Sequence, residues 1–366
     1  MQVSRNRDGH CIGGKEVEPP INVGIIGYGY SGRNFHSYLI GLEKRLKLYA
    51  VCARNLKRRK QAEKEYSVKT FSDVDDMLSD DNVHLVVVAT PHNTHSELSI
   101  KAMEAGKHVV VEKIMCMNAR EADAMIEASK RNNVMLTVFH NRRWDGDYLT
   151  VRKILDEGIL GEPFLIEESI MWYNEKVDPT RWRSVKELGG GPLYDWGAHL
   201  IDHAVQIGKV PVDRVYCFSV RRRKETDIEN YIKCHIHFEN GLTYGVEQGD
   251  MARINRPRWY ILGTLGALTK TGVDPQEQAM NVRNIDAAVE SPENYPLART
   301  IKDGVISETR IQTIRGDWKQ FYKNVADHLV DGKELAVKPE DVKRAVAVAE
   351  TALKSAKEQR SIACKI

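Results

Sequence analysis

Apolar and polar residues follow one another in two different patterns, and the change falls near residue 143. Before it, the chain holds short and nearly unbroken runs of Val, Ile and Leu, at 22–27, 46–53, 83–90, 108–113 and 134–140. Stretches with apolar residues at helical spacing separate these runs, for example 95–105 and 119–131. Strands that are apolar on both faces are typical of a parallel sheet covered by helices on both sides. The pattern predicts a doubly wound α/β domain over residues 21–143, preceded by an arm at 1–20.

The second pattern favours an α+β domain over residues 144–366. In 230–238, Ile232, Cys234, Ile236 and Phe238 alternate with Lys233, His235 and His237, a period of two that indicates one buried and one open face. We expect an open, mostly antiparallel sheet with helices on one side. Its strands are predicted at 163–170, 212–220, 230–238, 242–248 and 258–263, and its helices at 148–157, 316–330 and 339–359.

Composition excludes several classes of protein. The 366 residues are 42% hydrophobic and 29% charged with a net charge of +3, which gives no case for nucleic acid as the main partner. No apolar run reaches the roughly 20 residues that span a bilayer, and the first 20 residues lack a signal-peptide core. Six cysteines without metal-type spacing fit reduced thiols. We therefore expect a cytoplasmic protein that does not act at a membrane.

A glycine-rich turn joins the first predicted strand to a helix. Gly27-Tyr28-Gly29-Tyr30-Ser31-Gly32 fits GxGxxG, a pattern that becomes informative in this strand–turn–helix context. Gly27 allows the tight turn, Gly29 lets a pyrophosphate approach the backbone, and Gly32 lets the helix pack on the strand. The N–H groups at the helix start favour phosphate. The turn predicts a site for NAD or NADP, with Tyr28, Tyr30 and Ser31 as further contacts.

The end of the second predicted strand bears on the choice between NAD and NADP. A carboxylate about 20 residues after the glycines binds the ribose 2′-hydroxyl of NAD. Here Ala53 and Arg54 occupy this end, and an arginine can pair with a 2′-phosphate. NADP is favoured by charge, but an arginine can also stack on adenine, so both cofactors stay open.

Three further motifs resemble one known family. Thr90-Pro91-His92-Asn93-Thr94-His95 is similar to the TPxxxH segment of the Gfo/Idh/MocA oxidoreductases, and Glu112-Lys113 is similar to their Glu-Lys-Pro signature. The segment from Gly189 to His199 resembles their glycine-rich lead into a DxxxH helix. The resemblance extends over nearly the whole chain from about residue 21. One departure is Ile114, directly after Lys113, where the family usually has proline.

The resemblance implies oxidation of a secondary hydroxyl of a sugar, inositol or glycoside, a glycoside C3 position included. Lys113 would bond the reacting oxygen, and Asp195 would hold the substrate beside His199. Residue chemistry agrees, because an imidazole suits proton removal near neutral pH and an ammonium stabilises developing alkoxide charge. Asp195 and His199 are four positions apart and would share a helix face.

The remaining candidates are assigned by their place in these motifs. Contacts to the cofactor are expected from Thr90, Pro91, His92, His95, Glu112, Lys113, Asn141, Arg142 and Trp182. Contacts to the substrate are expected from Arg143, Asp202 and Tyr322, with Asp202 alternatively orienting His199. His199 and His203 have the i, i+4 spacing of a zinc helix but lack its glutamate, so no metal is expected.

Other interpretations remain. Lys113 could be a surface lysine, Asp195 a helix cap and His199 a core histidine. The chain could be an NAD(P)-binding redox regulator without catalysis, although such proteins typically lose the lysine or the histidine. It could also reduce an imine or a pyrrole ring. The open sheet face predicts a homo-oligomer, a dimer or a tetramer, because exposed apolar surface tends to be covered.

Overall fold

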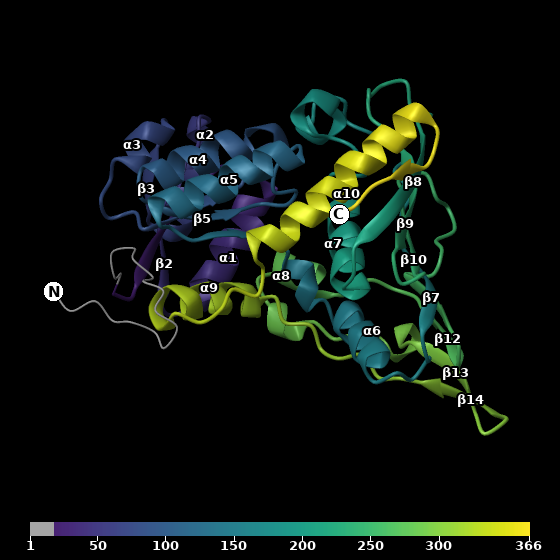
Figure 1. The fold of residues 1–366 in the computed structure, drawn as a ribbon. Helices are drawn as coiled ribbons and strands as arrows, with labels where there is room; N and C mark the ends of the chain where they lie inside the picture. The colour runs from purple at the N-terminus through teal and green to yellow at the C-terminus, as the bar shows by residue number, and fades with distance from the viewer. Residues whose placement is uncertain (1–17) are drawn as a thin grey trace.

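The structure is a computed structural model that describes residues 18–366. Residues 1–17 of the predicted arm at 1–20, Cys11 among them, therefore lie outside the described residues. In the described part, the chain forms two sheets that lie side by side, with helices packed between them (Figure 1).

The first sheet is parallel and has the strand order β3-β2-β1-β4-β5-β6 within residues 18–366. Its strands are β1 (Ile21–Ile26), β2 (Leu46–Cys52), β3 (Lys69–Phe71), β4 (Leu85–Val88), β5 (His108–Val111) and β6 (Leu136–Val138). All five strands predicted from apolar runs are present. The short edge strand β3 was not predicted, because Lys-Thr-Phe carries no apolar pattern. The order reverses between β1 and β4, and such a point leaves a crevice at the carboxyl ends of the strands.

Helices cover both faces of this sheet and begin at recognisable caps. The side chains of Asn55 and Asn118 accept hydrogen bonds from Lys57 N and Glu121 N, which satisfies free N–H groups at the two helix starts. The elements are η1 (Gly32–His36), α1 (Ser37–Leu42), α2 (Leu56–Tyr66), α3 (Val74–Leu78), η2 (His92–Thr94), α4 (His95–Glu104) and α5 (Ala119–Asn132).

The second sheet is mostly antiparallel, with β7 and β10 as its parallel pair. Its order is β14-β13-β12-β11-β7-β10-β9-β8-β15. The strands are β7 (Pro163–Met171), β8 (Val212–Val220), β9 (Tyr231–Phe238), β10 (Thr243–Gly249), β11 (Trp259–Gly263), β12 (Gly266–Lys270), β13 (Leu297–Lys302), β14 (Val305–Arg310) and β15 (Ile362–Ala363). The alternation predicted in β9 is confirmed. The sequence missed β12 to β15, of which β14 is exposed along its whole length and β15 has two residues.

Helices lie against one face of the second sheet, as predicted (Figure 1). They include α6 (Gly146–Asp156), α7 (Trp196–Gly208) and α10 (Pro339–Glu358), and α10 contacts β8 and α7 as well as α5 of the first sheet. The remaining helical elements are η3 (Asn141–Trp144), η4 (Trp182–Ser184), η5 (Lys186–Leu188), α8 (Gln276–Asn281), η6 (Ile285–Ala287), η7 (Pro292–Asn294) and α9 (Lys319–Asp331). Since α9 also contacts α1, both terminal helices return to the first sheet, and the division at residue 143 stays a prediction.

Candidate active site

Two cavities meet at the carboxyl ends of the strands of the first sheet. One, of about 640 Å³, extends along the glycine-rich turn and is called the cofactor cavity below. The other, of about 430 Å³, lies between the two sheets and is called the substrate cavity. Five residues line both: Tyr30, Ser31, Glu112, Lys113 and Arg183. A molecule bound in one cavity therefore touches the wall of the other.

The glycine-rich turn has the shape that a pyrophosphate requires. Gly27 has φ +97°, and a side chain there would run into Ala89 O. At Gly29 a Cβ atom would meet nothing within 4 Å, so the backbone is open to an approaching ligand. Gly32 is buried where the helical segment 32–42 packs on the strand. The cradle fits a nicotinamide dinucleotide, and residues 27–31 line the cofactor cavity.

The far end of the cofactor cavity is basic. Ala53 and Arg54 line it, together with Asn55, Arg58 and Ser72, which were not among the predicted contacts. The residues that β2, α2 and the β3–α3 turn contribute to this lining include no carboxylate. Arg58 was hidden in the run Lys57–Lys60, which looks like an ordinary solvated helix face.

The segment after β4 divides into lining and supporting residues. Thr90, Pro91 and His92 line the cofactor cavity. His92 Nδ1 lies 2.8 Å from Gly189 O, and the His92 ring contacts the Trp182 ring edge to face. His95 does not line it. The His95 ring nitrogens lie 2.7 Å from Ile114 O and 3.0 Å from Thr90 O, so this buried histidine ties the turn after β4 to the backbone that follows Lys113.

Glu112 connects the glycine-rich turn to the catalytic candidates. It accepts hydrogen bonds from the Ser31 hydroxyl, from His36 Nε2 at 3.0 Å and from Lys113 N at 3.0 Å. Burial opposes ionisation of this carboxyl, but the hydrogen bond from His36 and the further contacts lower its pKa to about 2. A fixed negative charge therefore lies between the two cavities.

Lys113, Asp195 and His199 all line the substrate cavity. Lys113 Nζ donates to Asp195 Oδ1 at 2.9 Å and to Asp195 O at 2.8 Å, and Arg183 Nε lies 3.7 Å from the same carboxylate. Burial opposes ionisation of Asp195, but Lys113 and Arg183 hold its pKa well below the usual range. The peptide bond between Lys113 and Ile114 is cis, and the lysine reaches the cavity with isoleucine in place of proline.

One expectation about Asp195 is wrong. Asp195 precedes the helix, since α7 begins at Trp196 and Asp195 has φ −84° and ψ −100°. It therefore does not share a helix face with His199, and its side chain makes no capping hydrogen bond. The glycine-rich lead places it instead: Asp195 N donates to Gly191 O at 3.1 Å, and Gly197 N donates to Gln248 Oε1 at 3.0 Å.

His199 is neutral in this setting. Burial, together with the nearby charges of Lys113 and Arg142, holds its pKa well below the usual range. A neutral imidazole can accept a proton, as a general base must.

Arg142 forms one wall of the substrate cavity. Its guanidinium lies 3.8 Å from the Trp196 ring centre and donates to Glu277 at 2.7 Å and to Asp145 at 3.2 Å. Asn141 and Arg142 line this cavity and not the cofactor cavity, where they were expected. Trp196 lies within the predicted motif from Gly189 to His199, whereas no sequence motif marked Glu277 as a cavity residue.

The three predicted substrate contacts Arg143, Asp202 and Tyr322 lie behind the cavity wall. Arg143 and Asp202 are buried and form a two-pronged pair at 2.7 and 2.8 Å. Tyr322 is fully buried, and its hydroxyl lies 2.6 Å from His36 Nδ1. Neither cavity is lined by any of the three, because each finds a polar partner inside the protein.

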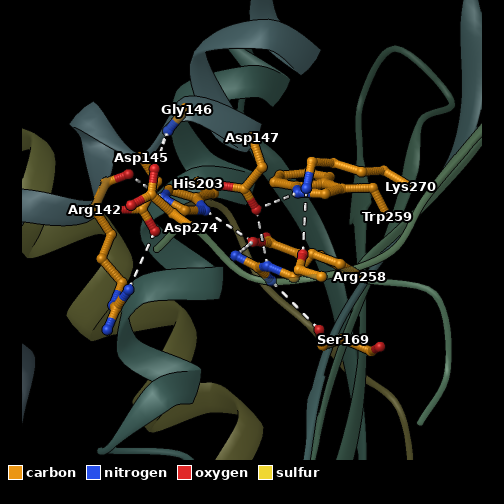
Figure 2. Close-up of polar contacts among 12 residues, drawn as sticks. Arg142, Asp145, Gly146, Asp147, Ser169, His203, Arg258, Trp259, Lys270 and Asp274 are labelled. Atoms are coloured by element: carbon orange, nitrogen blue, oxygen red, sulfur yellow. Dashed lines mark hydrogen bonds and ion pairs between the residues drawn. The ribbon is translucent and has the colours of Figure 1, made fainter. Parts of the chain in front are cut away.

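A buried network of charges supports Arg142 and α7 from behind (Figure 2). His203 Nε2 lies 3.2 Å from Arg142 O, and His203 Nδ1 lies 2.9 Å from Glu168 Oε1. Asp147 accepts from Arg258 Nε at 3.0 Å and from Trp259 Nε1 at 2.9 Å, as the dashed lines show. Both nitrogens of His203 are thus engaged. Among residues 18–366, no three His, Cys, Asp or Glu side chains are placed to hold a metal ion.

Comparison with known proteins places the chain among oxidoreductases. Residues 21–140 match a family model described as an oxidoreductase family with an NAD-binding Rossmann fold, and residues 148–269 match the GFO/IDH/MocA C-terminal domain. The scyllo-inositol 2-dehydrogenase (NADP(+)) IolW of Bacillus subtilis is 30% identical over 95% of this chain and 97% of its own. The myo-inositol 2-dehydrogenase of Thermotoga maritima is 26% identical over 93% and 98%.

Solved structures agree with this assignment. The structure of yvaA from Bacillus subtilis superposes with a TM-score of 0.89 at 28% identity, covering 96% of this chain and 100% of that one. Within residues 18–366, none of the helices combines the length and the apolar character that crossing a membrane requires.

Proposed function

The chain belongs to the Gfo/Idh/MocA family of oxidoreductases, and from this premise we propose that it oxidises a secondary ring hydroxyl of a cyclic polyol with NADP⁺. It is an NAD(P)-dependent enzyme acting on CH–OH groups. The observation that carries the proposal is the grouping of Lys113, Asp195 and His199 in the substrate cavity, where Lys113 also lines the cofactor cavity.

The residues divide the chemistry among them. The bound dinucleotide supplies the hydride acceptor. His199 takes the hydroxyl proton, since its imidazole is neutral and lines the cavity. Lys113 donates a hydrogen bond to the reacting oxygen and stabilises the alkoxide charge that develops there. Asp195 orients Lys113 through the 2.9 Å contact and binds a neighbouring hydroxyl.

NADP is the cofactor that the basic end of the cavity supports. Arg54 and Arg58 line the cofactor cavity just after β2, the part of the fold from which NAD-binding proteins supply a carboxylate to the ribose 2′-hydroxyl. A guanidinium pairs with phosphate through two parallel hydrogen bonds. The relative IolW is named for NADP.

Cyclic polyols are supported by the relatives and by the cavity. Two relatives are named as inositol dehydrogenases. Asn141, Asn174, Asn230 and Gln248 line the substrate cavity together with the rings of Trp172 and Trp196. Amide side chains can form hydrogen bonds with hydroxyls, and indole rings can pack on the apolar face of a polyol ring. A glycoside oxidised at C3 would use the same chemistry and belongs to the same substrate panel.

A homo-oligomer fits the open face of the second sheet. Tyr216, Phe218 and Tyr260 point away from the helices and are exposed. A second copy that covers them would bury apolar surface. Mass measurement in solution tests this, and a monomer would contradict it.

The experiment has two steps. Freshly purified protein is denatured, and any released nucleotide is identified by mass. The protein is then supplied with NADP⁺ or NAD⁺ and with scyllo-inositol, myo-inositol, glucose or a methyl glucoside, and absorbance at 340 nm is followed. Reduction of NADP⁺ by an inositol supports the proposal. Failure to bind either dinucleotide, or binding without turnover of any polyol, contradicts it.

A further inference from the structure

A second histidine lies directly behind His199. His140 follows β6, and the two ring centres are 5.6 Å apart with the planes at 86°, an edge-to-face contact. Both side chains are buried, and in both the Nδ1 atom is buried without a hydrogen-bond partner. Buried polar atoms are normally hydrogen-bonded, so two neighbouring buried nitrogens without partners require an explanation.

On its other side, His140 faces a fixed carboxylate. His140 Nδ1 lies 3.6 Å from Asp202 Oδ2. Arg143 donates to Asp202 through Nε and Nη2, and its Nη1 donates to Ala336 O at 3.0 Å, so the carboxylate is held in place on both of its oxygens. Burial opposes ionisation of Asp202, but Arg143 and the other neighbours lower its pKa to about 2, and the group stays charged.

The other neighbours of His199 cannot take the role of acceptor. Lys113 and Arg142 are cations, and both disfavour a charged His199. Asp195 accepts from Lys113 through Oδ1, and its carboxylate is not within hydrogen-bond reach of His199 Nδ1, which has no partner. His203, one turn along α7, uses both ring nitrogens on Glu168 and Arg142 O. His140 is therefore the neighbouring ring that can offer a lone pair.

We infer that Asp202, His140 and His199 form a relay in which His140 is a positioning residue for the catalytic base. In the relay, His140 Nδ1–H closes the 3.6 Å gap to Asp202 Oδ2 and donates to it, which leaves His140 Nε2 to accept from His199 Nδ1–H, so that both unpaired nitrogens gain a partner. This arrangement selects the tautomer of His199 whose Nε2 carries the lone pair toward the substrate hydroxyl. When His199 Nε2 takes the proton, the substrate O–H bond breaks and the new charge is stabilised through His140 toward Asp202. The relay rests on the proposed role of His199.

The charged and titratable groups around the relay have defined effects. Burial lowers the pKa of His140 to about 4; Asp202 acts against this, while Arg143, His203 and Lys113 add to it. Above this pH, His140 is neutral and can both donate and accept. Its effect on His199 is then that of a hydrogen-bond acceptor and not that of a second cation.

A matched pair of variants separates the relay from simple packing. In His140→Gln, the amide NH₂ can donate to Asp202 and the amide oxygen can accept from His199. In His140→Phe, ring size is kept and both hydrogen bonds are lost. The first readout is ¹⁵N NMR of histidine-labelled protein without cofactor, which reports the tautomer of His199. The second readout is the pH profile of kcat for inositol oxidation.

The relay predicts the Nδ1–H tautomer of His199 in the wild type and in His140→Gln, and a shift toward Nε2–H in His140→Phe. It predicts a kcat that falls by roughly tenfold or more in His140→Phe, with its acidic limb moved to lower pH, whereas His140→Gln stays within about threefold. Equal tautomer populations in all three proteins would overturn it, as would equal losses of kcat with an unmoved limb. If the wild type oxidises no polyol, the proposed function fails while the NMR measurement still decides the relay.

Discussion

Lys113 and Asp195 are 82 positions apart in the chain, and the ammonium of the first lies within 3 Å of both the carboxylate and the backbone oxygen of the second. Each residue comes from a different sheet: Lys113 follows β5, and Asp195 precedes α7 on the second sheet. The contact therefore joins the two halves of the molecule at the point where the two cavities meet.

Replacing Lys113 by methionine keeps the length of the side chain and removes the ammonium. We expect kcat to fall by about 10² to 10⁴ because the alkoxide loses its charged partner. The dissociation constant of NADPH, measured by quenching of protein fluorescence, should change by less than about threefold, since the rest of the cavity is intact. Lys64→Met, on the exposed face of α2, is the matched control and should leave both quantities unchanged. A Lys113→Met enzyme with wild-type kcat would exclude the assigned role.

The pH dependence of oxidation follows from the state of His199. The base must be neutral, and burial together with Lys113 and Arg142 lowers its pKa. A lowered pKa keeps the imidazole neutral to more acidic pH, so kcat should hold its plateau below pH 6.5, the ordinary histidine value. Rates measured from pH 4.5 to 9 test this. An acidic limb centred above 6.5 that vanishes in His199→Gln would contradict the assigned environment.

Substitution of Arg54 should change the preference of the protein between NADP⁺ and NAD⁺. Arg54→Glu places a carboxylate beside the 2′ position, where it repels a phosphate and can bind a hydroxyl. We expect NADP⁺ to bind about tenfold to a hundredfold more weakly, the equivalent of one lost charged hydrogen bond, while NAD⁺ binds as well or better. Isothermal titration with both dinucleotides measures this. Lys60→Glu makes the same charge change on α2 outside the cavity lining. Equal weakening in both variants would indicate a general charge effect.

The buried network in Figure 2 should contribute strongly to stability. Arg258 pairs with Asp147 at 3.0 Å and with Glu168 at 2.7 Å, and all three side chains are at most 2% exposed. Arg258→Met leaves two buried carboxylates without their cation, which costs about 3–5 kcal/mol of unfolding free energy. Urea unfolding measures this. Arg299→Met removes an exposed pair with Glu308 and should cost under about 1 kcal/mol. Equal losses in the two variants would contradict this account of the network.

The sequence predicted those features that local pattern determines. Leu85–Val88 and Val109–Val111 are apolar at every position, which is typical of a short strand buried on both faces, and GxGxxG after such a strand favours the glycine-rich turn. The places of polar residues were harder to predict from the sequence. Tyr322, Arg143 and Asp202 look like cavity residues in the sequence, but each is paired inside the protein, and no local signal tells a cavity-facing polar group from an internally bonded one. The cavity wall at Glu277 and Gln248 depends on how the two sheets pack, which no short segment encodes.

Lys113, Asp195 and His199 act together in the proposed oxidation of a cyclic polyol by NADP⁺. The most direct measurement is a single-turnover reaction of scyllo-inositol with the NADP⁺ complex of the wild type and of Asp195→Asn and His199→Gln, followed at 340 nm. The account predicts NADPH formation in the wild type and a rate lowered by at least about 10² in both variants, with NADP⁺ binding retained. NADPH formation at wild-type rates in either variant, or none in the wild type across the inositols despite tight NADP⁺ binding, would contradict it.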